Sequence, residues 1–119
     1  MALMFLPVTI THPTDRNKKT AVDFLIDSGA VYSVVPERIL KKLGILPEEE
    51  RTFTLANGET VKRKMGIARF EYANRIGGAP VVFGKTGDSA LLGATTLEAM
   101  GMALNPLKRE LMPLPMILG

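Results

Sequence analysis

The stretch that most constrains this chain runs from Phe24 to Ala30, where three apolar residues lead directly into Asp27, Ser28 and Gly29. Such a run predicts a buried strand that ends abruptly. A carboxyl at the end of a buried strand is costly to desolvate unless hydrogen bonds or a partner compensate. Gly29 allows the backbone to turn sharply at this point. The pattern therefore predicts a carboxyl, backed by a hydroxyl, on the floor of a cleft.

The composition of the 119 residues is typical of one globular domain, which we expect to span residues 1–119. Hydrophobic residues make up 46% of the chain and charged residues 23%, so global disorder is not expected. The net charge of +3 is spread along the sequence and aromatic residues are few, which argues against a nucleic-acid partner. The sequence has no cysteine and one histidine, His12, so we expect neither a metal site nor a cofactor.

The first ten residues are apolar, but they lack a basic start and are interrupted by Pro7, so no secretory signal is expected. No apolar run approaches the roughly 18 residues that a membrane-spanning helix needs. We therefore expect a cytoplasmic protein without a membrane partner.

Short β-branched and apolar segments separated by turn residues predict a mostly β protein. One short helix is expected over residues 37–43, between Pro36 and Gly44. A second is expected to begin with a capping box at residues 95–98 and to end at Gly101. The three glutamates at 48–50 are expected in a solvated connection. The expected strands cover residues 3–11, 20–27, 30–35, 52–56, 59–63, 66–72, 79–84, 102–104 and 110–118.

Asn57 and Gly58 stand between two of these strands, residues 52–56 and 59–63. Asn-Gly in this setting is the strongest short-range signal for a β-hairpin. The sequence does not distinguish a fixed tight turn from a mobile flap, so both interpretations stay open.

A weak internal repeat accompanies these elements. An apolar run, a glycine, a short helix, a second glycine and a strand occur over residues 24–46 and again over 91–104. This order suggests a domain of two similar halves, of which only the first carries the acid.

With these landmarks in order, the chain resembles the retropepsin-like aspartic proteases, the single-domain relatives of pepsin. The likeness extends from about residue 22 to residue 104. It implies a mostly β, closed retropepsin-like β-barrel with a flap hairpin and one or two short helices, active as a homodimer. The landmarks that carry it are Asp27-Ser28-Gly29-Ala30 after an apolar strand, the Ala56-Asn57-Gly58 hairpin, and Leu91-Leu92-Gly93 before a short helix.

The resemblance also implies a role for each matching residue. Asp27 would be the catalytic residue, and Ser28, Gly29 and Ala30 would support the active-site loop, with Ser28 bonding across the dimer. The expected flap residues are Ala56, Asn57, Gly58 and Glu59. The segment expected to support the loop from below is Leu91, Leu92 and Gly93. The expected pocket walls are Val31, Val34, Val61, Val82 and Ile67.

The chemistry implied by the family needs two carboxylates that share one proton, since like charges at short distance do not both ionise cheaply. One acts as base toward a water, while the protonated one polarises the peptide carbonyl. Asp15, Asp23 and Asp88 lack the context of Asp27, so the second carboxylate must come from a second copy. We therefore expect an aspartic endopeptidase that acts on a peptide or protein substrate as a homodimer.

Two positions depart from the retroviral pattern. Retroviral enzymes often carry an acidic residue just after the motif's alanine and an arginine just after the second glycine, which together brace the dimer. Here those positions are Val31 and Ala94, so bracing of that style is not expected. Residues 111–118 are the alternative source of interface strands.

Plainer interpretations stand beside these. Asp27 could be a buried acid satisfied by backbone donors, without a catalytic role. The alternative function is a catalytically inactive retropepsin-like fold that binds peptides or docks on another protein, with residues 111–118 as the docking segment.

Overall fold

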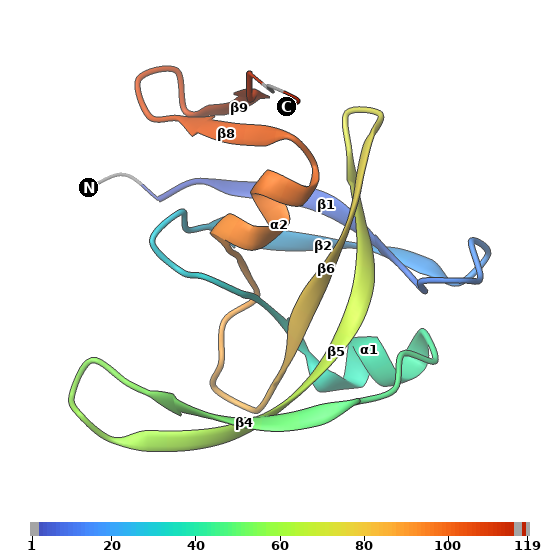
Figure 1. Ribbon diagram of the computed structural model, residues 1–119, viewed down its shortest axis with the longest axis vertical. Helices are drawn as coiled ribbons and strands as arrows, with labels where there is room; N and C mark the ends of the chain where they lie inside the picture. The colour runs from blue at the N-terminus through green and yellow to red at the C-terminus, as the bar shows by residue number, and fades with distance from the viewer. Residues whose placement is uncertain (1–2, 116–117, 119) are drawn as a thin grey trace.

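Figure 1 shows the computed structural model, which describes residues 3–115 and residue 118. Strands dominate that part of the chain and two short helices interrupt them, which confirms the prediction of a mostly β protein with short helices. In chain order the elements are β1 (Phe5–Thr11), β2 (Lys19–Ile26), β3 (Ser33–Pro36), α1 (Glu37–Lys42), β4 (Glu49–Thr54), β5 (Thr60–Tyr72), β6 (Arg75–Gly84), β7 (Leu91–Leu92), α2 (Ala94–Ala99), β8 (Met102–Asn105) and β9 (Glu110–Pro113).

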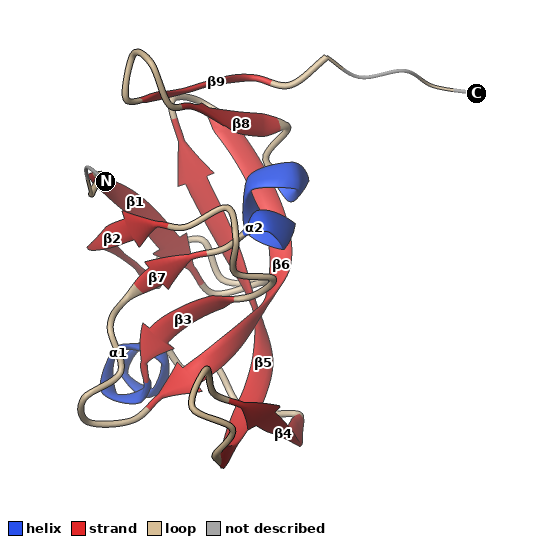
Figure 2. Ribbon diagram, turned by 90° about the vertical axis from the view of Figure 1, so that its left-hand side faces the viewer, coloured by secondary structure: helices blue, strands red, loops and turns tan. Residues whose placement is uncertain are grey.

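Seven of these strands form one sheet in the order β1-β2-β7-β3-β6-β5-β4, and β1 also pairs with β5. The extra pairing closes six strands into a ring and leaves β4 as an edge strand on β5. The long strand β5 makes this possible, because residues 60–65 pair with β4 while residues 69–71 pair with β1. The β4–β5 hairpin therefore extends from one end of the ring, as Figures 1 and 2 show.

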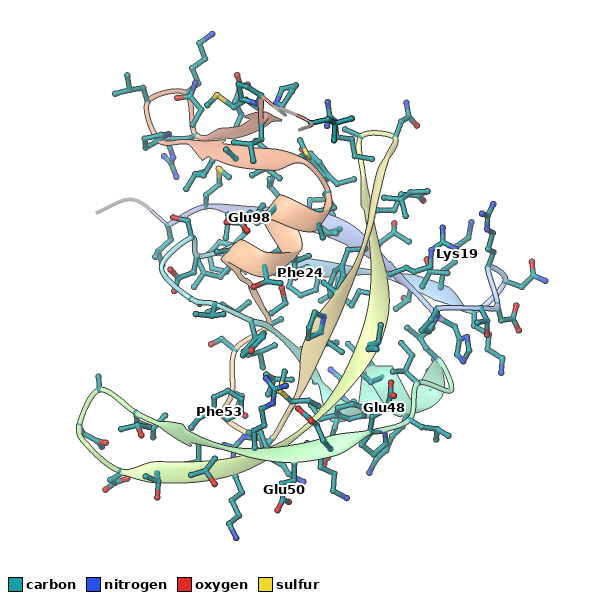
Figure 3. All side chains as sticks on the ribbon, viewed as in Figure 1. Lys19, Phe24, Glu48, Glu50, Phe53 and Glu98 are labelled. Atoms are coloured by element: carbon teal, nitrogen blue, oxygen red, sulfur yellow. The ribbon has the colours of Figure 1, made fainter. Side chains whose placement is uncertain are left out.

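The core lies within this ring and follows from the alternation of apolar and polar residues along the strands. In β2, Val22 and Phe24 are buried while Asp23 between them is exposed. Phe24 packs against Phe70 of β5, with ring centroids 6.2 Å apart. In Figure 3, Phe24 lies in the interior whereas Lys19 extends away from the body.

Each of the two helices packs one apolar face against this core. Leu40 of α1 and Leu97 of α2 are buried, and each helix ends one residue before its C-cap. Gly44 and Gly101 follow with φ of +75° and +67°, a conformation that glycine adopts without strain. The predicted helix ends at these two glycines are therefore confirmed. Among the described residues, no helix is long and apolar enough to cross a membrane.

The predicted capping box at the start of α2 is wrong. The helix begins at Ala94, its N-cap is Gly93, and no side chain caps it. The capping residue of the expected box is Thr95, and because the helix starts one residue earlier, at Ala94, Thr95 lies within its first turn.

The solvated connection expected at residues 48–50 is wrong in part, since β4 begins at Glu49. Glu49 and Glu50 pair with Met65 and Lys64 of β5, and their side chains stay exposed on an edge strand. Strand pairing along the edge of β5 thus overrides the low strand propensity of glutamate.

Two further strand boundaries differ from expectation. The strands expected at 59–63 and 66–72 are one continuous strand, because Gly66 permits close backbone approach instead of ending β5. A Cβ at Gly66 would lie 2.8 Å from the carbonyl oxygen of Leu46. Strand β6 starts at Arg75, before the expected residue 79, because the turn needs only Ala73 and Asn74, with φ of +50° and +65°.

The C-terminal strands β8 and β9 form a separate two-stranded antiparallel sheet. The strand expected over residues 110–118 ends at Pro113 within the described part of the chain. Met116 and Ile117, which that expectation also covered, lie outside the described residues.

Candidate active site

Asp27 stands directly after the last residue of β2 and is half-buried. Its backbone amide donates to the carbonyl oxygen of Leu92 at 2.9 Å, so its main chain continues the pairing of β2 with β7. Its carboxylate Oδ1 accepts a hydrogen bond from the amide of Gly29, also at 2.9 Å. The sequence thus places a carboxyl whose orientation is fixed by the loop that follows it, while part of the group remains accessible.

The segment after the motif crosses tightly over the start of α2. A Cβ at Gly93 would lie 2.6 Å from the carbonyl oxygen of Tyr32 and 2.9 Å from that of Ala30, so only glycine fits there. The amides of Ala94 and Thr95 donate to the carbonyl oxygens of Ala30 and Val31 at 2.7 and 3.0 Å. The first amides of α2, which lack partners within the helix, thereby hold the loop that follows the Asp27 motif. This crossing replaces the strand expected over residues 30–32.

A buried polar cluster below the loop connects these pieces through side chains. Ser33 Oγ accepts a hydrogen bond from the amide of Gly93 at 3.0 Å and also contacts Thr96 Oγ1 at 2.5 Å. Ser33 and Thr96 are fully buried. We did not predict this pair from the sequence. A hydroxyl at each of two otherwise apolar positions was the available signal, and it does not reveal which residues meet.

The β4–β5 hairpin ends in a loop over residues 55–59, which is longer than a two-residue turn. The amide of Leu55 donates to the carbonyl oxygen of Glu59 at 2.7 Å, and Asn57 Oδ1 accepts from the amide of Glu59 at 2.9 Å. Gly58 has φ of +87°. The predicted hairpin at Asn57-Gly58 is confirmed, and its four central residues, Ala56, Asn57, Gly58 and Glu59, are exposed.

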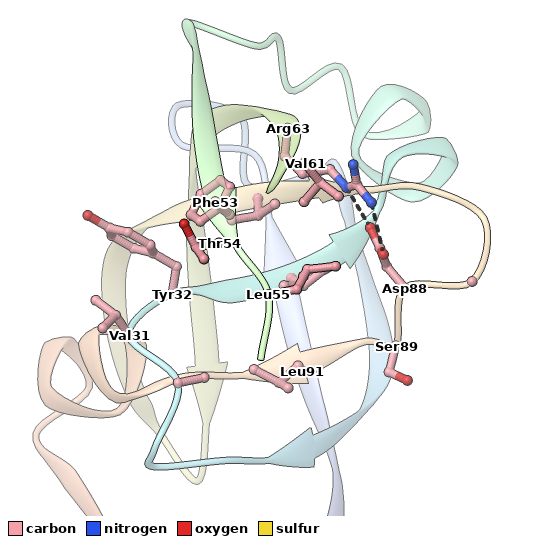
Figure 4. Close-up of a pocket in the computed structure, with 14 residues that line it drawn as sticks. Val31, Tyr32, Phe53, Thr54, Leu55, Val61, Arg63, Asp88, Ser89 and Leu91 are labelled. Atoms are coloured by element: carbon pink, nitrogen blue, oxygen red, sulfur yellow. Dashed lines mark hydrogen bonds and ion pairs between the residues drawn. The ribbon is translucent and has the colours of Figure 1, made fainter. Parts of the chain in front are cut away.

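A pocket of about 650 Å³ lies between this hairpin and the loop that follows the Asp-Ser-Gly motif. Figure 4 shows side chains from both sides converging on it. Four of the expected wall residues line it, together with Phe53, Leu55 and Leu91; these four are Val31, Val34, Val61 and Val82. Its lining is therefore mainly apolar, which suits an apolar side chain of a ligand.

The expectation that Ile67 lines this pocket is wrong. Ile67 is 48% exposed and borders a different depression beside Pro80, its pairing partner on β6. Its neighbours Gly66 and Ala68 are buried, and because side chains alternate along a strand, the Ile67 side chain projects from the other, exposed face of β5. Asp27 does not line the large pocket either; the lining begins three residues later, at Ala30.

Two polar contacts connect the hairpin with the walls of the pocket. Arg63 of β5 donates to both carboxylate oxygens of Asp88, at 2.8 and 3.2 Å. These hydrogen bonds hold the pKa of Asp88 below its ordinary value, since they favour the ionised carboxyl. On the other side, Arg51 Nη1 donates to the hydroxyl of Tyr32 at 2.7 Å.

A second, smaller depression of about 370 Å³ lies on the other side of the motif. The exposed Ser28 borders it, and the remaining lining comes from α2 and from the segment that carries β8 and β9, including Ala94, Leu104 and Leu114. The residue next to Asp27 therefore faces a partly apolar surface.

Among residues 3–115 and 118, no three His, Asp or Glu side chains are arranged to hold a metal ion. The described site thus consists of one carboxyl on a braced loop, an apolar pocket and a hairpin beside it.

Comparison with protein families agrees with this arrangement. A family model described as aspartyl protease matches residues 7–96, which is well over half of the chain and includes Asp27, the hairpin and Leu91 to Gly93. The chain therefore belongs to the aspartyl protease family, within the retropepsin-like clan. A search of curated proteins found no match to the chain.

Proposed function

We propose that this protein is an aspartic endopeptidase that hydrolyses peptide bonds with a water activated by two Asp27 carboxylates, one from each subunit of a homodimer. The observation that carries the proposal is the half-exposed carboxyl of Asp27 at the end of β2, oriented by the amide of Gly29. Membership of the aspartyl protease family supports a peptide as the substrate.

The chemistry requires the two carboxyls to titrate as a pair. When they lie close together, ionisation of one raises the pKa of the other, so a single proton is shared between them. The ionised partner takes a proton from the water as it attacks, and the protonated partner donates toward the carbonyl oxygen of the substrate. No metal takes part in this proposal.

The surface beside Ser28 is the proposed contact between subunits. Two Asp27 carboxyls meet only if a twofold axis passes close to the motif, and Ser28 is the exposed residue next to the acid. The depression that Ser28 borders is lined partly by apolar side chains of α2 and of the β8–β9 segment. This contact replaces the acidic and basic bracing that Val31 and Ala94 do not provide.

The closed ring of strands is proposed to be the β-barrel of the family, and the β4–β5 hairpin its flap. An extended peptide would lie between the hairpin and the loop after the motif, with its backbone paired as an added strand and an apolar side chain in the large pocket. Closure of the hairpin would exclude water from the cleft.

Digestion of a peptide library from about pH 4 to 7, the range around a raised carboxyl pKa, tests the proposal. We expect the parent to cleave and Asp27→Asn to be inactive, although its amide oxygen still accepts a hydrogen bond from Gly29. Asp23→Asn is the matched control, because Asp23 is exposed on the same strand and should be dispensable. Equal cleavage by the parent and Asp27→Asn would remove the catalytic assignment.

One observation favours a second candidate function, a peptide-binding module without catalysis. The large apolar pocket begins at Ala30 and does not include Asp27, so a ligand can occupy it without contact with the carboxyl. Peptide binding by the parent with no cleavage at any pH tested would support this alternative.

A further inference from the structure

One pair of directly opposed residues in the β4–β5 hairpin, here called the arginine rung, consists of two arginines. Arg51 of β4 pairs directly with Arg63 of β5 in the antiparallel ladder. Directly opposed residues of antiparallel strands project their side chains from the same face. Two cations side by side repel each other, so this pair destabilises the hairpin unless each guanidinium group binds an acceptor of its own.

The two guanidinium groups find those partners on different walls of the large pocket. Arg63 makes a two-pronged contact with Asp88, in the segment between β6 and β7. Arg51 donates to the hydroxyl of Tyr32, and its guanidinium carbon lies 5.5 Å from the centroid of the Tyr32 ring. The rung therefore bridges the cleft from wall to wall.

Each partner belongs to a segment that frames the candidate acid. The carbonyl of Tyr32 is packed against Gly93, at the crossing that holds the active-site loop. Asp88 is fixed by a hydrogen bond from the amide of Lys85 at 2.8 Å, and it lies three residues before Leu91. Neither wall can move freely with the hairpin, because both are attached to the floor of the site.

The contacts beyond this rung, toward the tip, are weaker. Phe53 meets Tyr32 edge to face with ring centroids 6.4 Å apart, and the loop over residues 55–59 is exposed. Aromatic edge contacts contribute less than charge-assisted hydrogen bonds with two prongs. An entering ligand would therefore displace the tip contacts before it displaces the arginines.

We propose that Arg51 and Arg63 are positioning residues that form the hinge line of the hairpin, so that its opening is confined to residues 52–62. This inference rests on the proposed function, since it assigns the hairpin the role of a flap over a peptide.

The two anchors are unequal. The side chains of Arg63 and Asp88 are 19% and 29% exposed, which limits competition from water. Arg51 is 44% exposed and also forms an ion pair with Glu49 on its own strand. Loss of Arg63 should therefore loosen the hairpin more than loss of Arg51.

Spin labels can measure this motion directly, because the chain has no native cysteine. We would place one label at Ala56→Cys, in the exposed hairpin loop, and one at Lys42→Cys, at the exposed end of α1. Labelled chains diluted with unlabelled chains report the distance within one subunit. The parent should give a narrow distance distribution, Arg63→Met a broader one shifted to longer distances, and Arg51→Met a smaller shift.

Lys62→Met is the matched control, because Lys62 is adjacent to Arg63 but pairs with Thr52 and projects from the opposite face. It should leave the distribution unchanged. If both arginine variants match Lys62→Met while remaining folded by thermal unfolding, the hinge assignment is wrong.

Kinetics separate this inference from the proposed function. If the parent cleaves peptides, Arg63→Met should raise KM about two- to fivefold, the range expected for one partly exposed ion pair. The pH profile of cleavage should not shift, because the acid pair is untouched. If the parent cleaves nothing, the endopeptidase proposal fails, and the label distances still decide whether the rung is the hinge.

Discussion

The backbone amide of Asp27 donates to the carbonyl oxygen of Leu92 at 2.9 Å, which joins two segments that are far apart in the sequence. This hydrogen bond continues the parallel pairing of β2 with β7, so the candidate acid leaves its strand beside Gly93. The loop after Asp27 then returns across Gly93 and is held by the amides of Ala94 and Thr95. The position of the carboxyl is thus set mainly by backbone contacts, and substitutions at the crossing should act on it most strongly.

Gly93→Ala should destabilise the protein severely. The new Cβ would lie 2.6 and 2.7 Å from the carbonyl group of Tyr32 and 2.9 Å from the carbonyl oxygen of Ala30, and backbone atoms cannot move aside like a flexible side chain. We expect a loss of at least about 2 kcal/mol in the free energy of unfolding, measured by chemical denaturation.

Gly78→Ala is the control for that experiment. A Cβ at Gly78, an exposed position on β6, would meet no atom within 4 Å. We expect an unchanged or slightly increased stability, since alanine restricts the unfolded chain more than glycine does. Similar stabilities for the two variants would mean that the loop does not cross the start of α2 this closely.

Removing the buried hydroxyl of Ser33 should lower the free energy of unfolding more than removing that of Thr96. Ser33→Ala removes the acceptor of the Gly93 amide as well as the partner of Thr96, so it should cost about 1–3 kcal/mol of unfolding free energy. Thr96→Val keeps the shape and leaves the Gly93 contact in place, so it should cost about 1 kcal/mol.

Thr95→Val serves as the neighbour control for this pair, because its backbone amide, which contacts Val31, is unaffected by the change. It should have little effect on denaturation. An equal cost for Ser33→Ala and Thr95→Val would show that the buried cluster does not support the loop.

The features that the sequence predicted correctly depend on residues close together in the chain. The end of β2 before Asp27, the hairpin at Asn57-Gly58 and the helix ends at Gly44 and Gly101 follow from local backbone preferences and from short apolar runs. The resemblance to the retropepsin-like aspartic proteases rested on the Asp27 motif, the Asn57-Gly58 hairpin and Leu91-Leu92-Gly93, and the family match over residues 7–96 confirms it.

The features that were missed depend on register or on distant partners. The contact of Ser33 with Thr96 joins residues 63 positions apart, and neither position differs locally from an ordinary hydroxyl. The pairing of Arg51 with Arg63 becomes visible only when the register of β4 on β5 is known. Ile67 was expected in the pocket wall from the family resemblance, although the alternation along β5 turns its side chain away from the pocket.

The ion pair between Arg63 and Asp88 should make stability depend on pH in one direction. Its hydrogen bonds lower the pKa of Asp88 in the folded protein below the ordinary value of 3.8. A lowered folded pKa gives stability that is fully present above the ordinary pKa and is lost as the pH falls through the folded pKa. The difference in thermal stability between the parent and Arg63→Met should therefore be constant near neutral pH and shrink below about pH 4.

The size of this difference should be small, below about 1 kcal/mol, because both side chains are partly exposed. The difference in thermal stability between the parent and Lys62→Met should not change with pH. A difference that instead grows as the pH falls would contradict the assignment of Asp88 as the ionised partner.

Mixing of subunits tests whether one site needs two chains. If each active site contains two Asp27 carboxyls, a dimer of one parent and one Asp27→Asn chain is inactive. At equal amounts and with free exchange, each parent chain meets another parent chain in about half of the dimers that it forms, so activity per parent chain should fall to about half. Mixing with Asp23→Asn should leave the activity per total chain unchanged, since every dimer then contains two Asp27 carboxyls. Activity per parent chain that stays constant as Asp27→Asn is added would show that a single chain suffices, and the shared site would have to be abandoned.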